Sequence, residues 1–223
     1  MTSAFLVTSA IRTELGIYDA ATRSRQTRAT FASIRLRVPG VRIALLEMSN
    51  PPLDDDTAEQ FAGTVDWYVT VSHPMIDAVR AAPTTPSTLK TVSELAGVHL
   101  FLGHACRQQL FTGIDRVFKL SARYALTEDF ELTRHMKPNC YVLRRANAGR
   151  HSSRLWSFDA ALIADARERI GLMLDESAKR LAAGEDVDMG DLLFRHLPAA
   201  RKQSIAVLGV QGYPGGLGEL VIE

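Results

Sequence analysis

Three apolar runs open the chain: AFLVTSA at residues 4–10, VRIALLE at residues 41–47 and VDWYVTV at residues 65–71. Each has the length of a buried β-strand, and a helical pattern fills residues 19–38 between the first two. Acidic residues open a second helical segment, residues 54–62, before the third run. This alternation of strands and helices predicts a parallel sheet covered by helices on both faces, where near-continuous apolar strands are buried.

The rest of the chain continues the alternation. Helical patterns begin at residue 74 and cover residues 89–111, 159–183 and 189–197, while segments of strand length occupy residues 116–124, 141–145, 154–158 and 204–210. Residues 83–88 and the glycine-rich residues 212–218 are predicted to be loops. We therefore expect an α/β fold with a mostly parallel central sheet flanked by helices, in one domain over residues 1–223.

The composition excludes several classes of protein. The 223 residues are 46% hydrophobic and carry a formal net charge of +1, which argues against a disordered chain and against bulk electrostatic binding to nucleic acid. The two cysteines, Cys106 and Cys140, do not form a disulfide framework or a zinc-binding spacing. No signal-peptide pattern and no apolar run of about 20 residues is present, so we expect a cytoplasmic protein without a transmembrane segment.

Several familiar chemistries are also excluded by their motifs. The chain has no G-x-x-x-x-G-K-[ST] phosphate loop and no G-x-S-x-G nucleophile elbow. His99 and His104 are five residues apart, which does not align them as a zinc pair on a helix. Carboxylates 54–56 could hold Mg²⁺ or Mn²⁺ beside a diphosphate, but their place at a helix start favours capping.

The segment DRVFKLSARY, residues 115–124, carries the most informative polar pattern. Side chains on a strand alternate between its faces, so Lys119, Ser121 and Arg123 share one face. Unpaired buried charges are costly, so these cations need an anionic partner, either a protein carboxylate or a ligand phosphate. An edge strand with solvated side chains is the alternative interpretation.

This segment resembles the K-[IL]-S-G-R-Y segment of small bacterial and viral glycosyltransferase-like proteins of the GT-A, or nucleotide-diphospho-sugar transferase, fold. Four further segments resemble the same family in order, at residues 5–12, 46–50, 101–104 and 156–158. The resemblance implies a glycosyltransferase that moves a sugar from a nucleotide-diphosphate sugar to a hydroxyl acceptor, such as a glycan or cell-surface polysaccharide. It also implies a nucleotide-binding half, about residues 1–125, and an acceptor and catalytic half, about residues 126–223.

Two departures from the family pattern bear on activity. Many GT-A enzymes carry an Asp-x-Asp metal motif where this chain has Lys119, Ser121 and Arg123. The resemblance therefore implies a transferase that can work without a metal, although Mg²⁺ or Mn²⁺ remains an option. Gly190 stands where relatives carry an acidic residue, so either Asp191 or Asp188 acts as base, or the chain is a catalytically silent module that binds a nucleotide or a partner.

The resemblance also implies roles for individual residues. We expect Asp191 to be the catalytic base and Lys119 and Arg123 to be the cations that stabilise the departing diphosphate. The nucleotide-sugar contacts are expected from Thr8, Ser9, Arg12, Glu47, Ser121 and Tyr124. Other interpretations stay open: Glu47 as a carboxylate paired with an arginine, Arg12 as a surface residue, and the whole chain as a sulfotransferase, although the phosphate loop of that class is missing.

Overall fold

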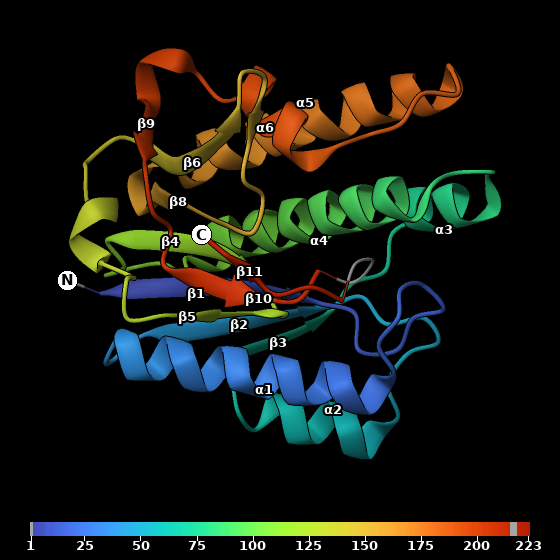
Figure 1. Cartoon of the computed structure of the whole chain (residues 1–223), viewed down its shortest axis with the longest axis horizontal. Coiled ribbons are helices and arrows are strands. Elements are labelled where there is room, and N and C mark those ends of the chain that lie inside the picture. The colour runs from blue at the N-terminus through green and yellow to red at the C-terminus, as the bar shows by residue number, and fades with distance from the viewer. Residues whose placement is uncertain (1, 215–217) are drawn as a thin grey trace.

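The computed structural model describes residues 2–214 and 218–223 and is built around one large sheet with the strand order β3-β2-β1-β4-β8-β6-β7, to which β9 is added beside β6 (Figure 1). Its first four strands are mutually parallel, as the sequence predicts: β1 (Ser3–Ser9), β2 (Arg42–Glu47), β3 (Trp67–Thr70) and β4 (Arg116–Ser121). The side chains of β1 are buried along its whole length. This pattern confirms that the apolar opening run is a central strand.

The other half of the sheet is mixed in direction. Strand β8 runs antiparallel to β4 and to β6, and β9 pairs in parallel with β6. The bounds are β6 (Tyr141–Asn147), β7 (Arg150–His151), β8 (Leu155–Asp159) and β9 (Lys202–Ile205). The prediction of one strand over residues 204–210 is wrong. The strand β9 ends at Ile205, and Gly209, whose φ of 67° is left-handed, directly precedes the next strand, which begins at Val210.

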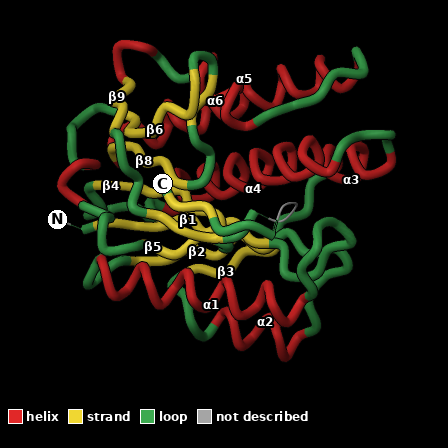
Figure 2. Tube along the Cα trace, viewed as in Figure 1, coloured by secondary structure: helices red, strands yellow, loops and turns green. Residues whose placement is uncertain are grey.

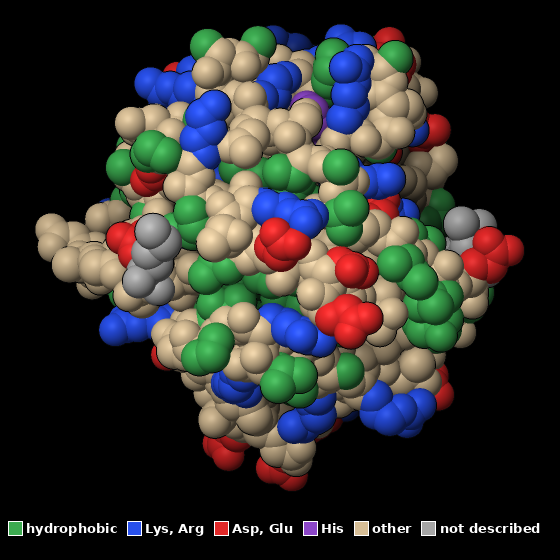
Figure 3. Space-filling view, turned by 60° about the vertical axis from the view of Figure 1, so that its left-hand side comes forward, with side chains coloured by type: hydrophobic (Ala, Val, Ile, Leu, Met, Phe, Trp, Pro, Cys, Tyr) green, Lys and Arg blue, Asp and Glu red, His purple; other side chains and the backbone are tan. Residues whose placement is uncertain are grey.

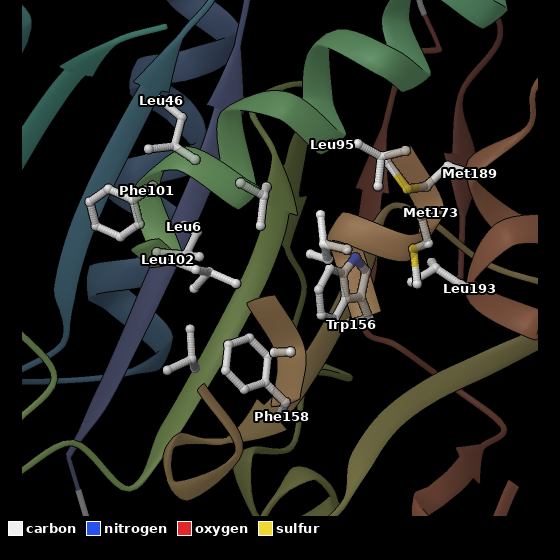
Figure 4. Close-up of a cluster of buried hydrophobic side chains, with 14 of the residues drawn as sticks. Leu6, Leu46, Leu95, Phe101, Leu102, Trp156, Phe158, Met173, Met189 and Leu193 are labelled. Carbon is white, nitrogen blue, oxygen red and sulfur yellow. The ribbon is translucent and has the colours of Figure 1, made fainter. Parts of the chain in front are cut away.

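Helices cover both faces of the sheet, with the strands in the layer between them (Figure 2). One face carries α1 (Ala20–Arg37) and α2 (Asp55–Ala62), and the other carries α3 (Pro74–Ala81), α4 (Pro86–Gln108), α5 (Ile163–Ala182) and α6 (Met189–His196). Figure 4 shows the apolar cluster on the second face, where Trp156 and Phe158 lie between the sheet and the helices. Short 3₁₀ helices cover Leu132–His135, Ala160–Leu162 and Ala199–Arg201.

The helix ends follow from local hydrogen bonding. Asp54 caps α2 by accepting from the Thr57 amide at 2.9 Å, which confirms the capping interpretation of this acidic cluster. Thr85 caps α4 in the same way, so this helix begins at Pro86 and takes in part of the segment that we expected to be a loop. The predicted apolar face of α1 is buried as expected, at Thr27, Phe31, Ile34 and Val38.

A small second sheet follows the end of β4. It has the order β11-β10-β5, formed by β5 (Tyr124–Leu126), β10 (Val210–Gly212) and β11 (Val221–Ile222). The prediction of a single strand over residues 116–124 is therefore wrong, because the chain turns at Ala122 and Arg123. The hydroxyl of Thr30 on α1 lies 3.0 Å from the carbonyl oxygens of both Ala122 and Tyr124 and fixes this turn. Residues 215–217 of the expected glycine-rich loop lie outside the described residues.

Candidate functional site

A cavity of about 900 Å³ opens at the carboxyl ends of the parallel strands. The chain passes from β1 outward to β2 and β3 and then returns to the other side of β1 as β4, so the strand order reverses between β1 and β4. In open α/β sheets such a reversal leaves a crevice in which ligands bind. The cavity is completed by the first half of α4, the β6–β7 hairpin and the start of α6.

The structure brings together five of the site residues that the sequence suggested. The cavity wall contains Thr8 and Ser9 at the end of β1, Ser121 at the end of β4, and Arg123 and Tyr124 at the turn into β5. The other four, Arg12, Glu47, Lys119 and Asp191, are not among the described residues that line the cavity.

Lys119 contributes to the site through Glu94, a carboxylate on α4 that sequence reasoning missed. Its ammonium group forms an ion pair with Glu94, and both side chains are almost fully buried. The same oxygen of Glu94, Oε1, accepts hydrogen bonds from the Thr8 hydroxyl at 2.5 Å and from the Ser121 hydroxyl at 3.0 Å. The anionic partner that the cations of β4 require is thus, for Lys119, a protein carboxylate.

The pKa of Glu94 reflects this surrounding. Although burial acts to raise it, the positive charges of Lys119 and Lys90 lower the pKa of Glu94 to about 2. Glu94 is therefore a carboxylate at any physiological pH. It joins the ends of β1 and β4 from the helix above them.

Two cations in the cavity have no protein partner. In the described residues, neither Lys90 on α4 nor Arg123 makes an ion pair or a side-chain hydrogen bond, and both line the cavity. Although the Lys90 side chain is exposed, nearby protein atoms reduce its hydration and lower its pKa to about 8; Glu94 opposes this shift, and Arg123 and Lys119 add to it. Lys90 is exposed and Arg123 is half-buried, so both cations are accessible to an anion that enters the cavity.

The side chains of the described cavity wall carry an excess of positive charge. Six basic side chains line it, against three carboxylates at Glu14, Glu94 and Asp188. By contrast, basic and acidic side chains are interspersed on the outer face shown in Figure 3. A cavity with excess positive charge and mostly polar strand ends fits an anionic ligand such as a diphosphate.

The loop that follows β1 is held by Arg23, a buried arginine on α1. Its guanidinium donates to the carbonyl oxygens of Tyr18 at 3.0 Å, Leu15 at 2.6 Å and Ala10 at 3.3 Å. Because the three carbonyl groups lie in different parts of the loop, these hydrogen bonds fix the path of the loop along the cavity. Arg23 itself also lines the cavity.

Glu47 and Arg12 lie behind the same loop. Glu47 is 1% exposed, and its Oε1 accepts from the amide of Ile11 at 3.0 Å and from the hydroxyl of Ser49 at 2.5 Å. Arg12 forms an ion pair with Asp54, the cap of α2. In the structure both residues therefore hold the loops around β1 and β2 rather than pointing into the cavity.

The start of α6 separates the two candidate bases. Asp188 caps the helix by accepting from the Asp191 amide at 3.0 Å, lies 3.5 Å from Arg150 and lines the cavity. Asp191 instead forms ion pairs with Arg180 and Arg195, each at 2.9 Å. Although partial burial acts to raise it, the hydrogen bonds from these two arginines hold the pKa of Asp191 below its usual value.

Gly190 has a structural reason for lacking a side chain. A Cβ at this position would lie 2.3 Å from the carbonyl oxygen of His151 on β7, which is closer than any real contact allows. The start of α6 packs against β7 so closely that only glycine fits. An acidic side chain at position 190, as in the resembling proteins, is therefore incompatible with this packing.

The residues at the end of β4 do not fit a divalent cation. The turn places the guanidinium of Arg123 there, and the nearby carboxylate of Glu94 is already bound by Lys119. No three His, Cys, Asp or Glu side chains gather as ligands within residues 2–214 and 218–223. Asp54 of the acidic cluster is occupied by Arg12 and the α2 amide.

The comparisons with known proteins bear on the fold. No family model and no curated protein matches the sequence. A solved structure, the glycosyltransferase GlyE of Streptococcus pneumoniae TIGR4, matches 91% of this chain with a TM-score of 0.52 and 13% sequence identity. The chain has a glycosyltransferase-like fold. The chain spans 44% of the length of the GlyE chain. The match therefore concerns the fold and does not assign the activity of GlyE to this chain.

One further finding concerns membranes. Among the described helices, none has both the length and the apolar character needed to cross a bilayer.

Proposed function

We propose that the protein is a glycosyltransferase that moves a sugar from a nucleotide-diphosphate sugar to the hydroxyl group of a glycan or polysaccharide acceptor. The observation that carries this proposal is the pair of cavity cations, Lys90 and Arg123, which have no ion-pair partner among the described residues. The glycosyltransferase-like fold and the cavity of about 900 Å³ support it. The donor diphosphate supplies the negative charge that this cavity lacks.

The cations would replace a metal ion in this reaction. As the bond from the sugar anomeric carbon to the diphosphate breaks, the electron pair leaves with the nucleoside diphosphate. Lys90 and Arg123 stabilise the negative charge that develops on that leaving group, and Arg123 can bind two phosphate oxygens with its planar guanidinium. Lys119 supports them indirectly, because it holds Glu94 in the wall beneath them.

A cavity carboxylate would activate the acceptor. The acceptor hydroxyl loses its proton to the carboxylate while its oxygen bonds to the anomeric carbon, which gives an inverting displacement. Asp188 is the better placed candidate, since it lines the cavity, whereas Asp191 does not line it and is held by two arginines. The nucleoside would lie along Thr8, Ser9, Ser121 and Tyr124, with Arg12 and Glu47 shaping the loops around it.

The test compares the two carboxylates in a donor-consumption assay with UDP-, GDP- and dTDP-sugars, with and without Mn²⁺. Asparagine is also a good helix cap, so Asp188→Asn preserves the start of α6. We expect this variant to lower turnover by about 10²–10⁴-fold, the usual size of a general-base contribution. Asp191→Asn serves as the matched comparison. Equal turnover in both variants and the parent would remove Asp188 and Asp191 from the mechanism.

A second candidate function is a nucleotide-binding module without transferase activity. The observation that favours it is Gly190, which the packing against His151 keeps free of a catalytic side chain. Calorimetry with the same nucleotide sugars separates the two functions. Binding without consumption in the presence of glycan acceptors would favour the module, and consumption would favour the enzyme.

A further inference from the structure

The carboxylate of Glu94 uses only one of its two oxygens in the fold. Oε1 receives Thr8, Ser121 and Lys119. In the described part of the chain Oε2 makes no hydrogen bond. It is also not one of the fully buried polar atoms that lack a hydrogen-bond partner. This oxygen therefore retains accessible surface, and the space that Glu94 lines is the cavity.

The position of Glu94 defines what can reach that oxygen. Glu94 lies on α4 one helical turn after Lys90, so both side chains project from one face of the helix. Its partner Lys119 also donates to the carbonyl oxygen of Ser153 at 3.1 Å. Ser153 and Asp188 also line the cavity. Glu94 thus lies at the ends of β1 and β4, one turn further along α4 than Lys90.

We infer that Glu94 is a donor-binding residue whose Oε2 accepts a hydrogen bond from a hydroxyl group of the transferred sugar. This inference rests on the proposed function. A sugar attached to a diphosphate at Lys90 and Arg123 lies in the same cavity that Glu94 lines. A carboxylate accepts hydrogen bonds only, so it selects a hydroxyl donor and disfavours a further phosphate or carboxylate.

The experiment measures binding by calorimetry for the whole chain, Glu94→Gln and Lys119→Gln. The probes are UDP, GDP and dTDP, their glucose or mannose conjugates, and monodeoxy forms of whichever conjugate binds. In the parent protein, removal of one particular sugar hydroxyl is expected to weaken binding by about tenfold or more, as for a hydrogen bond to a charged group. In Glu94→Gln the same removal is expected to have little further effect, because the two changes delete one interaction.

Lys119→Gln is the control for a structural effect, since it breaks the buried ion pair and keeps the Glu94 carboxylate. It is expected to retain the tenfold deoxygenation effect even though the fold is weakened. If Glu94→Gln does not fold, Glu94→Asp takes its place, because it keeps the charge and withdraws it by one methylene.

The outcomes separate this inference from the function on which it rests. Deoxygenation effects that are the same in the parent and in the Glu94 variant would overturn it. It would also be overturned if Glu94→Gln lost affinity equally for the free nucleoside diphosphate and for the sugar conjugate, because Glu94 would then serve the nucleoside or the fold. Absence of nucleotide binding in the parent protein would refute the proposed function itself.

Discussion

Two groups of charged side chains differ in how their charges are matched. The α5–α6 network consists of Glu176, Arg180, Asp191, Arg195 and His196, in which each carboxylate contacts basic side chains within 3 Å. The cavity cluster consists of Lys90, Glu94, Lys119 and Arg123, in which a single carboxylate faces three cations. Matched charges indicate a structural role, whereas the unmatched excess of the cavity cluster indicates that a ligand completes it.

The largest expected effect concerns the buried pair of the cavity cluster. Lys119→Ala leaves Glu94 almost fully buried without its ion-pair partner. Breaking a buried pair in this way costs about 3–5 kcal/mol of the free energy of unfolding. For a chain of this length the melting temperature is then expected to fall by on the order of 10 °C. Urea unfolding followed by circular dichroism measures the loss, and a change below about 1 kcal/mol would show that water reaches this pair.

The second effect concerns the unmatched cations themselves. Lys90→Ala combined with Arg123→Ala removes both charges that lack a protein partner, and we expect nucleotide-diphosphate affinity to fall by about 100-fold or more. Stability should stay constant or increase, because the repulsion among the cavity cations is relieved. Calorimetry and thermal unfolding test the two statements together. Lys179→Ala, an exposed position on α5, is the matched control, and equal affinity in both variants would contradict the ligand role.

The close approach of α6 to β7 gives the third prediction. In Gly190→Ala the new methyl group would meet the carbonyl oxygen of His151, so the start of α6 must shift away from the hairpin. Overpacking of this kind typically costs about 1–3 kcal/mol. The shift should also displace Asp188 from the cavity and lower turnover. Gly149→Ala is a suitable control, since a Cβ there meets no atom within 4 Å, and identical unfolding midpoints would refute the packing argument.

Some parts of the fold follow from local sequence patterns, and others depend on contacts between distant residues. The apolar runs and the helical face of α1 are determined by local periodicity, so strands β1 to β3 and the parallel half of the sheet follow from the sequence. The turn at Ala122 depends on the hydroxyl of Thr30, which is 92 residues away in sequence. No local pattern carries that contact, and the strand was therefore predicted three residues too long.

The candidate site shows the same division. The family resemblance suggests Thr8 and Ser9, and the polar pattern of residues 119–123 suggests Ser121 and Arg123; all four line the cavity. Glu94 and Lys90 were missed because they belong to a long helix, where charges four residues apart normally indicate a solvated face. The available signal was that Glu94 is flanked by the apolar residues Val92 and Leu95, a setting in which a carboxylate requires a partner.

The titration of Lys90 provides the fourth prediction. Loss of hydration lowers its pKa to about 8, with Glu94 opposing and the neighbouring cations contributing. Lys90 is therefore charged below pH 8 and becomes neutral above it, whereas a bound diphosphate favours the charged form and raises the pKa. Affinity for the nucleoside diphosphate should fall by about tenfold from pH 7.5 to 9.5, since one pKa unit corresponds to about 1.4 kcal/mol. Lys90→Arg stays charged over this range and should show a flat profile.

The smallest expected effect is a change of stability in the α5–α6 network, where the charges are matched. Hydrogen bonds from arginines hold the pKa of Asp191 below its usual value, against the effect of partial burial, and the pKa of Glu176 is likewise lowered by His196 and Arg180. Stability from a carboxylate with a lowered pKa is present above the unfolded value and is lost as the pH falls through the folded value. Asp191→Asn should therefore cost about 1 kcal/mol or less at pH 7, as for partly exposed ion pairs, and the difference from the parent should vanish in acid. Denaturant midpoints between pH 7 and pH 2 measure this difference. A loss that persists at pH 2, or one as large as that of Lys119→Ala, would show that the α5–α6 network is not merely a set of matched surface charges.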